Sequence, residues 1–236
     1  MIYINNSGYG CIKGSLHKFK NGGKHNYDDF PWYQVSETID ELSEVLGIDV
    51  RYLKLINLEW GVNIKTEIAP KEIISGLVMH KGVRFEKMYV SPGTCYICAH
   101  AQFSVKVYDK GTQYRLPENI LRIEISSNKA AFINSFGIIT LDDLQYPERI
   151  ANLQNSLLCG GWRDSLLIEP GLFDNYHLDK KMQGRISNWS NPLYWMEAKN
   201  RNRCYQKKEY DAFRLANGFD TKEKIYQAIL NKYREL

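Results

Sequence analysis

Hydrophobic and polar residues follow different periods before and after about residue 150. Before it, period-2 stretches, typical of half-buried strands, stand between windows with the 3.6-residue spacing of amphipathic helices. These patterns predict strands at about 12–20, 53–64, 84–90, 95–109 and 120–126, and helices at about 33–46, 70–79 and 128–135. After it, they predict helices near 147–159, 192–217 and 221–235. The order predicts an α+β fold with a mainly antiparallel sheet, helices on one face of it, and two regions, 1–146 and 147–236.

Glycine and proline mark several of the predicted boundaries. The Asn21-Gly22-Gly23 run is a turn signal and closes the first predicted strand. Gly47 follows the last apolar position of the 33–46 helix, where a helix commonly ends in the left-handed conformation. Pro70 begins the next predicted helix, because proline is favoured at the first helical position.

Three predicted strands divide into one apolar and one polar face. In the 56–64 strand the even positions are apolar, whereas in the 97–108 strand the odd positions are. The 121–126 strand has its apolar residues at odd positions as well. Apolar faces of this kind can pack under helices. The opposite faces carry the candidate site residues Glu59, Asn63, His100, Gln102, Lys106, Tyr108, Arg122 and Glu124.

A polar strand face is often merely solvated, but two features here favour a functional site. Carboxylates are poor strand formers, yet Glu59 and Glu124 each stand alone among strongly apolar neighbours. Gly61 weakens its strand, and a strand glycine commonly marks the close approach of a backbone or a ligand. Oxygen ligands on adjacent strands with an imidazole nearby suit Mg²⁺ or Mn²⁺ better than a thiolate-bound metal.

Composition excludes some classes of protein. The 236 residues are 44% hydrophobic and 25% charged, which is ordinary for a globular chain and argues against a disordered one. We see no apolar run near the roughly 20 residues that span a bilayer and no signal-peptide core, so we expect a cytoplasmic protein with no membrane partner. Five cysteines with one C-x-x-C pair, Cys95 and Cys98, argue against a disulfide framework or a structural zinc site. The net charge of +4 favours polyanionic partners slightly.

Four short segments, in this order and spacing, carry a family resemblance. They are SLHKFKNGG (15–23), NLEWGVNI (57–64), FSVKVYDKG (103–111) and LRIEI (121–125). Together they resemble the replication initiation factor family of small plasmids and single-stranded-DNA phages, which are rolling-circle initiators related to the HUH-type endonucleases. The resemblance covers about residues 12–145 and implies a ferredoxin-like replication-initiator core in region 1–146, followed by a helical region.

The resemblance implies an enzyme that nicks and rejoins origin DNA. In the family a divalent metal, Mg²⁺ or Mn²⁺, polarises the scissile phosphate and a tyrosine attacks it, which leaves a 5′-phosphotyrosyl link and a free 3′-OH. By position, Tyr108 of the Y-D-K motif matches the nucleophile. Glu59 and Glu124 match the acidic metal ligands, and Asn63 falls where a second acid often stands.

The family's histidine–hydrophobic–histidine pair is absent, and His100-Ala101-Gln102 is its nearest counterpart, with His100 as a metal ligand and Gln102 near the DNA. Tyrosine is a weak nucleophile at neutral pH and needs a cation nearby. Lys106, on the same strand face as Tyr108, or Lys110 just past the strand could meet that need.

Other candidate residues keep more than one interpretation. His17 and Lys18, beside the Asn-Gly-Gly turn, could grip a DNA backbone or hairpin stem, or simply belong to a polar turn, and Arg122 is a further candidate DNA contact. Tyr108 could also be an ordinary strand aromatic, and Tyr114 is a second candidate nucleophile.

The implied partner is single-stranded or hairpin origin DNA, and the resemblance also admits a host helicase or polymerase and a second copy of the chain. One alternative is a non-catalytic protein that binds single-stranded nucleic acid on the same sheet. A related tyrosine transposase or relaxase is the other alternative, although these normally show a clear double-histidine motif.

Overall fold

The structure is a computed structural model that describes residues 1–4, 6, 10–89, 92–172 and 178–236, with 156–158 described by their backbone alone. The strands are β1 (Ile2–Ile4), β2 (Gly10–Ile12), β3 (Glu59–Lys65), β4 (Leu77–His80), β5 (Val83–Arg84), β6 (Glu86–Met88), β7 (Cys95–Ala99), β8 (Phe103–Asp109), β9 (Ile120–Ser127) and β10 (Ser165–Leu167). The α-helices are α1 (Leu16–Lys20), α2 (Trp32–Leu46), α3 (Pro70–Ser75), α4 (Lys110–Tyr114), α5 (Ala130–Asn134), α6 (Pro147–Leu153), α7 (Gly160–Asp164), α8 (Lys180–Ser190), α9 (Pro192–Glu197), α10 (Asn200–Ala216) and α11 (Thr221–Glu235). Two 3₁₀ turns, η1 (Val50–Tyr52) and η2 (Leu141–Gln145), and one π-helical segment, η3 (Gln154–Cys159), complete the described elements.

The main sheet has five strands in the order β3-β9-β8-β7-β6, and every neighbouring pair is antiparallel. This confirms the predicted α+β class with a mainly antiparallel sheet. The two central pairs are in register over their full length, with Glu59 opposite Ser126 and Lys106 opposite Glu124. Paired residues point to the same face, so the register decides which side chains meet.

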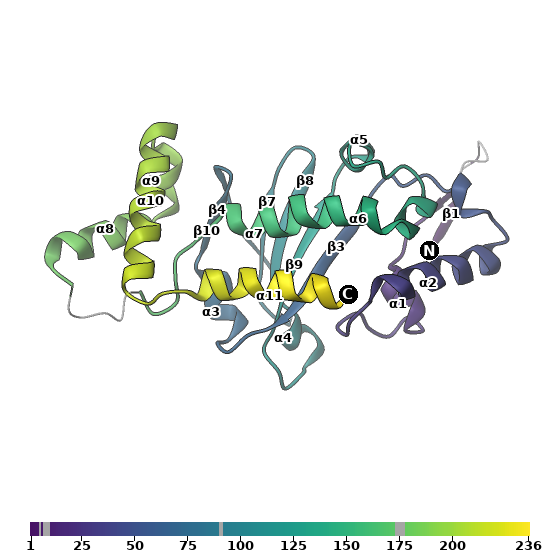
Figure 1. Ribbon diagram of the computed structural model, residues 1–236, viewed down its shortest axis with the longest axis horizontal. Coiled ribbons are helices and arrows are strands. Elements are labelled where there is room, and N and C mark those ends of the chain that lie inside the picture. The colour runs from purple at the N-terminus through teal and green to yellow at the C-terminus, as the bar shows by residue number, and fades with distance from the viewer. Residues whose placement is uncertain (5, 7–9, 90–91, 173–177) are drawn as a thin grey trace.

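Helices cover one face of the main sheet. Figure 1 shows α11 and the run from α6 to α7 crossing it, and α11 packs on β3 while η3 packs on β9. The core between them contains Ile123 and Ile125 of β9, Trp162 of α7, and Ile225 and Ile229 of α11. Elements from both sides of the predicted boundary at residue 146 therefore share one hydrophobic core.

A second, smaller sheet extends the molecule beyond this core. It has the order β10-β4-β5, again antiparallel. Its apolar residues Val78 and Leu166 pack with Trp189, Trp195 and Tyr210, so that α8, α9 and α10 form a helical group at this end of the molecule, on the left of Figure 1. The helices α1 and α2 lie at the opposite end.

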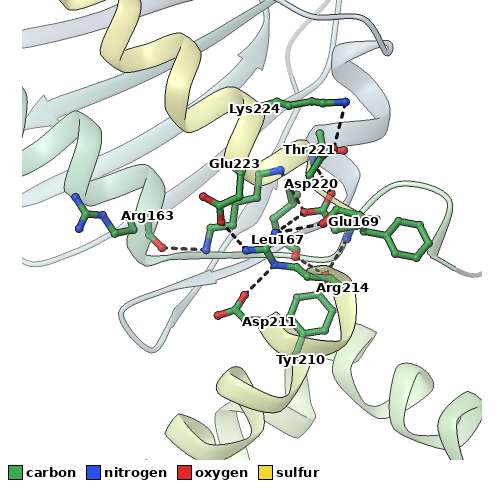
Figure 2. Close-up of polar contacts among 12 residues, drawn as sticks. Arg163, Leu167, Glu169, Tyr210, Asp211, Arg214, Asp220, Thr221, Glu223 and Lys224 are labelled. Carbon is green, nitrogen blue, oxygen red and sulfur yellow. Dashed lines mark hydrogen bonds and ion pairs between the residues drawn. The ribbon is translucent and has the colours of Figure 1, made fainter. Parts of the chain in front are cut away.

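Arg214 connects the helical group to the rest of the chain. Its guanidinium, on α10, donates to Glu169 (3.3 Å), Asp211 (2.9 Å) and Glu223 (2.7 Å), as Figure 2 shows. Glu169 also accepts from the backbone N–H of Thr221 at 3.1 Å, at the start of α11. The buried pair of Arg214 and Glu169 thus links α10 to the start of α11.

Several predicted elements are confirmed. The 33–46 helix is α2, and Gly47 ends it with a φ of 62°. The 221–235 helix is α11 and the 120–126 strand is β9. The Asn-Gly-Gly turn is also present, with Gly22 and Gly23 at φ values of 60° and 82°.

The predicted strand at 12–20 is wrong, because residues 16–20 form α1. Ser15 caps this helix, since its hydroxyl accepts from the Lys18 N–H at 3.2 Å. Leu16 and Phe19, three residues apart, lie on one side of the helix, and Leu16 packs against the main core. The serine cap outweighed an apparent alternation that was only a few residues long.

The second half of the predicted 70–79 helix is also wrong. The helix α3 ends at Ser75, and residues 77–80 form β4, paired with the unpredicted strand β10. A Cβ at Gly76 would overlap the carbonyl oxygen of Ile168, so the chain passes close to its partner at this point. A strand partner almost 90 residues away leaves no local signal.

Two long predictions divide into shorter elements. The predicted 95–109 strand is a hairpin of β7 and β8, and the 192–217 helix is α9 followed by α10. The 84–90 strand corresponds to β5 and β6, and its last residue lies outside the described residues. The predicted 147–159 helix is α6 continued by the π-helical η3, and α8 was not predicted.

Candidate active site

Strands β3, β9 and β8 gather most of the predicted site residues on one face of the main sheet. In the register, Gly61, Glu124 and Lys106 form one row across the three strands, and Asn63, Arg122 and Tyr108 form the next row. Glu59 lies one row further along, opposite Ser126. The period-2 pattern of each strand and the matched register together place these side chains beside one another. We call this set the polar face, comprising Glu59, Asn63, Lys106, Tyr108, Arg122 and Glu124.

Glu124 is the centre of the polar face. Its Oε2 accepts from the Tyr108 hydroxyl at 3.1 Å and from Arg122 Nε at 2.9 Å, and its Oε1 accepts from Lys106 Nζ at 3.4 Å. Burial by itself would raise the pKa of Glu124, but the charge and hydrogen bond of Arg122, with help from Lys106, hold it below its ordinary value. Glu124 is therefore a carboxylate at neutral pH and holds the Tyr108 hydroxyl in place.

Tyr108 is half-buried at the end of β8. Burial raises the pKa of its hydroxyl far above the ordinary value of 10, and the nearby Glu124 raises it further, although the Arg122 guanidinium opposes both. The hydroxyl is thus a proton donor in this arrangement. To act as a nucleophile it must lose its proton to a neighbouring base as the new bond forms.

Lys110 begins α4 directly after β8, and its side chain is buried beside Tyr108. Its Nζ donates to Asn26 Oδ1 at 2.7 Å and lies 5.4 Å from the Tyr108 ring centroid and 4.8 Å from that of Tyr114. Burial, together with the positive charge of Arg122, lowers the pKa of Lys110 to about 7. A lysine with this pKa can give or take a proton at neutral pH, as an acid–base group requires.

Part of the polar face is covered by α1 and the segment that follows it. Asn63 donates from Nδ2 to the carbonyl oxygen of Tyr27 at 2.9 Å, and Asn26 meets Lys110. His17 belongs to this cover, because its Nε2 lies 2.7 Å from Asp28 and its ring stacks on Phe30. Burial lowers the pKa of His17, although Asp28 opposes the shift.

The two predicted DNA contacts in α1 therefore differ. The His17 ring is held inside the covering segment, whereas Lys18 is exposed to solvent. Arg122 is likewise engaged, since its Nη1 donates to Asn63 Oδ1 at 3.1 Å and its Nε to Glu124. Of His17, Lys18 and Arg122, Lys18 is the one that can meet a phosphate without rearrangement of these contacts.

The polar face does not fit a divalent metal as it is arranged. Glu59 and Glu124 are the available carboxylates, but Lys106 Nζ stands between them, 2.6 Å from Glu59 Oε1 and 3.4 Å from Glu124 Oε1. The Asn63 amide oxygen is taken by Arg122. Mg²⁺ and Mn²⁺ prefer several free oxygen ligands. Here two cations already neutralise the carboxylates that would bind the ion.

His100 and Gln102 do not join this site. They lie in the turn between β7 and β8, at the opposite end of β8 from Tyr108, about 20 Å away for six extended residues. Because β7 pairs antiparallel with β8, His100 continues the side of Cys98, which faces the core beside Val105. The expectation of one continuous strand had placed His100 with Lys106, and the hairpin separates them.

His100 instead belongs to a second cluster that the sequence analysis missed. Its Nε2 lies 2.8 Å from His80 Nδ1 and 3.5 Å from Cys98 Sγ. Burial lowers the pKa of His80 to about 4 and raises that of Cys98 to about 11, so both are neutral at pH 7. His80 is 20 residues from His100 in the sequence, with no motif spacing that would have linked the two.

No family model, curated protein or solved structure matches this chain. In the part of the chain that the structure describes, we find no helix both long and apolar enough to cross a membrane.

Proposed function

We propose that the protein is a rolling-circle replication initiator that nicks and rejoins origin DNA through a covalent link to Tyr108. The observation that supports this best is the contact between the Tyr108 hydroxyl and Glu124, 3.1 Å apart, with Lys106 and Arg122 bound to the same carboxylate. The resemblance of the Y-D-K and LRIEI segments to such initiators points to the same tyrosine.

The proposed reaction is an exchange of one phosphodiester bond for another. The Tyr108 oxygen bonds to the phosphorus of the scissile phosphate while the bond from phosphorus to the 3′-oxygen breaks. Glu124 takes the tyrosine proton along their hydrogen bond, and Lys110 in its ammonium form gives a proton to the departing 3′-oxygen. The products are a 5′-phosphotyrosyl link and a free 3′-OH, and the reverse reaction rejoins the strand.

Cations on the polar face supply the electrostatic part of this mechanism. Negative charge develops on the phosphate oxygens in the transition state, and fixed positive groups nearby stabilise it. We assign this role to Lys106 and Arg122 on adjacent strands, which must release part of their contacts with the polar face to reach the phosphate. The resemblance assigns this task to Mg²⁺ or Mn²⁺, whereas our proposal assigns it to these two side chains, because they already contact the carboxylates that would bind the ion.

A denaturing gel tests the proposal directly. The protein is incubated with labelled single-stranded and hairpin oligonucleotides that tile the replicon encoding it, in Mn²⁺ and in chelator. We expect an adduct that survives denaturation and disappears in Tyr108→Phe, while Tyr52→Phe, a change at an exposed tyrosine, keeps it. An undiminished adduct in Tyr108→Phe would refute the central claim. Loss of the adduct in Tyr114→Phe alone would transfer the role to Tyr114.

The chelator lanes separate the two sources of positive charge. Adduct formation in chelator supports the role of Lys106 and Arg122. A strict requirement for Mn²⁺ would mean that Lys106 gives up its place between Glu59 and Glu124 when DNA binds.

A non-catalytic protein that binds single-stranded nucleic acid is the second candidate. The observation in its favour is the burial of Tyr108, which raises the pKa of the hydroxyl and makes it a poorer nucleophile. This candidate predicts binding of the same oligonucleotides without an adduct on any of them, or on supercoiled origin DNA.

A further inference from the structure

The two sheets meet at a cluster of soft-metal ligands that the proposed reaction does not use. His80 is the last residue of β4 in the three-stranded sheet, Cys98 is in β7 of the five-stranded sheet, and His100 follows β7. Nitrogen or sulfur ligand atoms of the three residues all lie within 4.8 Å of one another. The cluster lies on the core side of the main sheet, away from Tyr108 and Glu124.

Two distances within the cluster come close to those of a tetrahedral site. Zinc binds nitrogen at about 2.0–2.1 Å and thiolate sulfur at about 2.3 Å, which places two nitrogen ligands about 3.3 Å apart and a nitrogen and a sulfur about 3.6 Å apart. The Cys98 Sγ to His100 Nε2 distance of 3.5 Å already agrees. The His80 Nδ1 to His100 Nε2 distance of 2.8 Å must widen by about half an ångström for both nitrogens to bind one ion.

The surroundings of His80 also favour a ligand. Its side chain is only 1% exposed, and its Nε2 has no hydrogen-bond partner within the described residues. Within the described residues, the ring's polar contact is the one between Nδ1 and His100. The nitrogen that faces His100 is Nδ1, so Nδ1 would bind the ion while Nε2 keeps the ring proton. His100 is only half-buried, so an ion can reach the cluster from solvent.

We propose that His80, Cys98 and His100 bind one Zn²⁺ ion at the junction of the two sheets. Two imidazoles and a thiolate are the donors that zinc prefers and that Mg²⁺ or Mn²⁺ does not. Three protein ligands leave the fourth position to water or to a further ligand. On binding, the Cys98 thiol loses its proton to solvent and its sulfur bonds to the ion.

The ion would connect β4 to the end of β7. These strands belong to different sheets. β4 pairs with β10, and apolar residues of both strands pack against the helical group α8–α10. An ion that binds the folded chain alone stabilises it by mass action, so zinc raises the melting temperature. This role is independent of Tyr108 and of the proposed nicking reaction.

The first test uses Co²⁺ as a spectroscopic probe on the full chain. We expect one Co²⁺ per chain with the visible bands of a tetrahedral site and a thiolate-to-cobalt charge-transfer band. Stoichiometric Zn²⁺ should remove both signals. His100→Ala should weaken Zn²⁺ binding by at least about tenfold, because one of three ligands is lost.

Matched variants keep the test clear of folding effects. Cys98→Ala should abolish the charge-transfer band, whereas Cys95→Ala, a change at a buried cysteine on the opposite side of the same strand, should keep it. Circular dichroism with the unfolding midpoint of each apo variant shows whether it folds. The proposal is overturned if the folded wild type binds no stoichiometric Co²⁺ or Zn²⁺, or if folded His100→Ala and Cys98→Ala bind them as tightly as the wild type.

Discussion

Replacing Arg214 with methionine should lower the free energy of unfolding of the protein substantially. The Arg214 side chain is 3% exposed and its partner Glu169 is 0% exposed, with 3.3 Å between Nη1 and Oε1. Removing one partner of a buried ion pair typically costs about 3–5 kcal/mol, because it leaves the other charge uncompensated. Glu169 keeps two backbone donors, the N–H groups of Thr221 and Lys222, so we expect the lower end, about 3 kcal/mol.

Thermal and urea unfolding measure this effect. For a chain of this size, about 3 kcal/mol corresponds to a fall in the melting temperature of roughly 6–12 °C. Lys224→Met is the matched control, because Lys224 pairs with Asp220 at 3.2 Å but the two side chains are 62% and 50% exposed. Exposed pairs of this kind contribute about 0–1 kcal/mol, so the control should melt within a few degrees of the wild type.

A double variant separates the buried charge from lost packing. Glu169→Gln in the Arg214→Met background removes the uncompensated carboxylate and should recover part of the lost stability. If Arg214→Met melts no lower than Lys224→Met, the network in Figure 2 does not hold the helical group to the sheet, and the reasoning fails.

Three further predictions concern the polar face and the residues beside it. Gly61→Ala should lower the free energy of unfolding in urea by about 2 kcal/mol or more, because its Cβ would overlap the Ile123 carbonyl oxygen. The control Gly184→Ala, whose Cβ would meet nothing within 4 Å, should be neutral or slightly stabilising. Equal effects of the two changes would contradict this prediction. Lys110 has a pKa of about 7 in the folded chain, below its ordinary 10.5, so the unfolded chain binds more protons between these pH values. The free energy of unfolding of the wild type, relative to that of Lys110→Met, should therefore rise by about 2 kcal/mol from pH 7 to pH 9. A stability difference that does not change with pH would show that Lys110 titrates normally. Lys106→Met should bind Mn²⁺ at least about tenfold more tightly than the wild type in calorimetry, since the ammonium no longer competes for Glu59 and Glu124; unchanged affinity would show that these carboxylates cannot converge on an ion.

Local pattern was enough to predict the elements whose signals are complete within one segment. The α2 helix carries its apolar stripe and its terminal Gly47 together, and α11 carries a full stripe over four turns. The polar face was also predictable in outline. Period 2 fixes which residues of a strand share a face, so Glu59 and Asn63, Lys106 and Tyr108, and Arg122 and Glu124 were each expected as pairs. Their chemical roles stay predictions until the adduct is tested.

Tertiary structure alone decided the rest, because it depends on partners far away in the sequence. The turn at 100–102 reverses the chain, which moves His100 away from Tyr108 and beside Cys98. The β4 strand exists because β10 pairs with it from almost 90 residues away, and this pairing brings His80 to the same cluster. Periodicity reports which side of its own element a residue occupies. It does not report which element lies opposite, and that contact decides whether a polar residue is solvated, paired with a charge or poised to bind a metal.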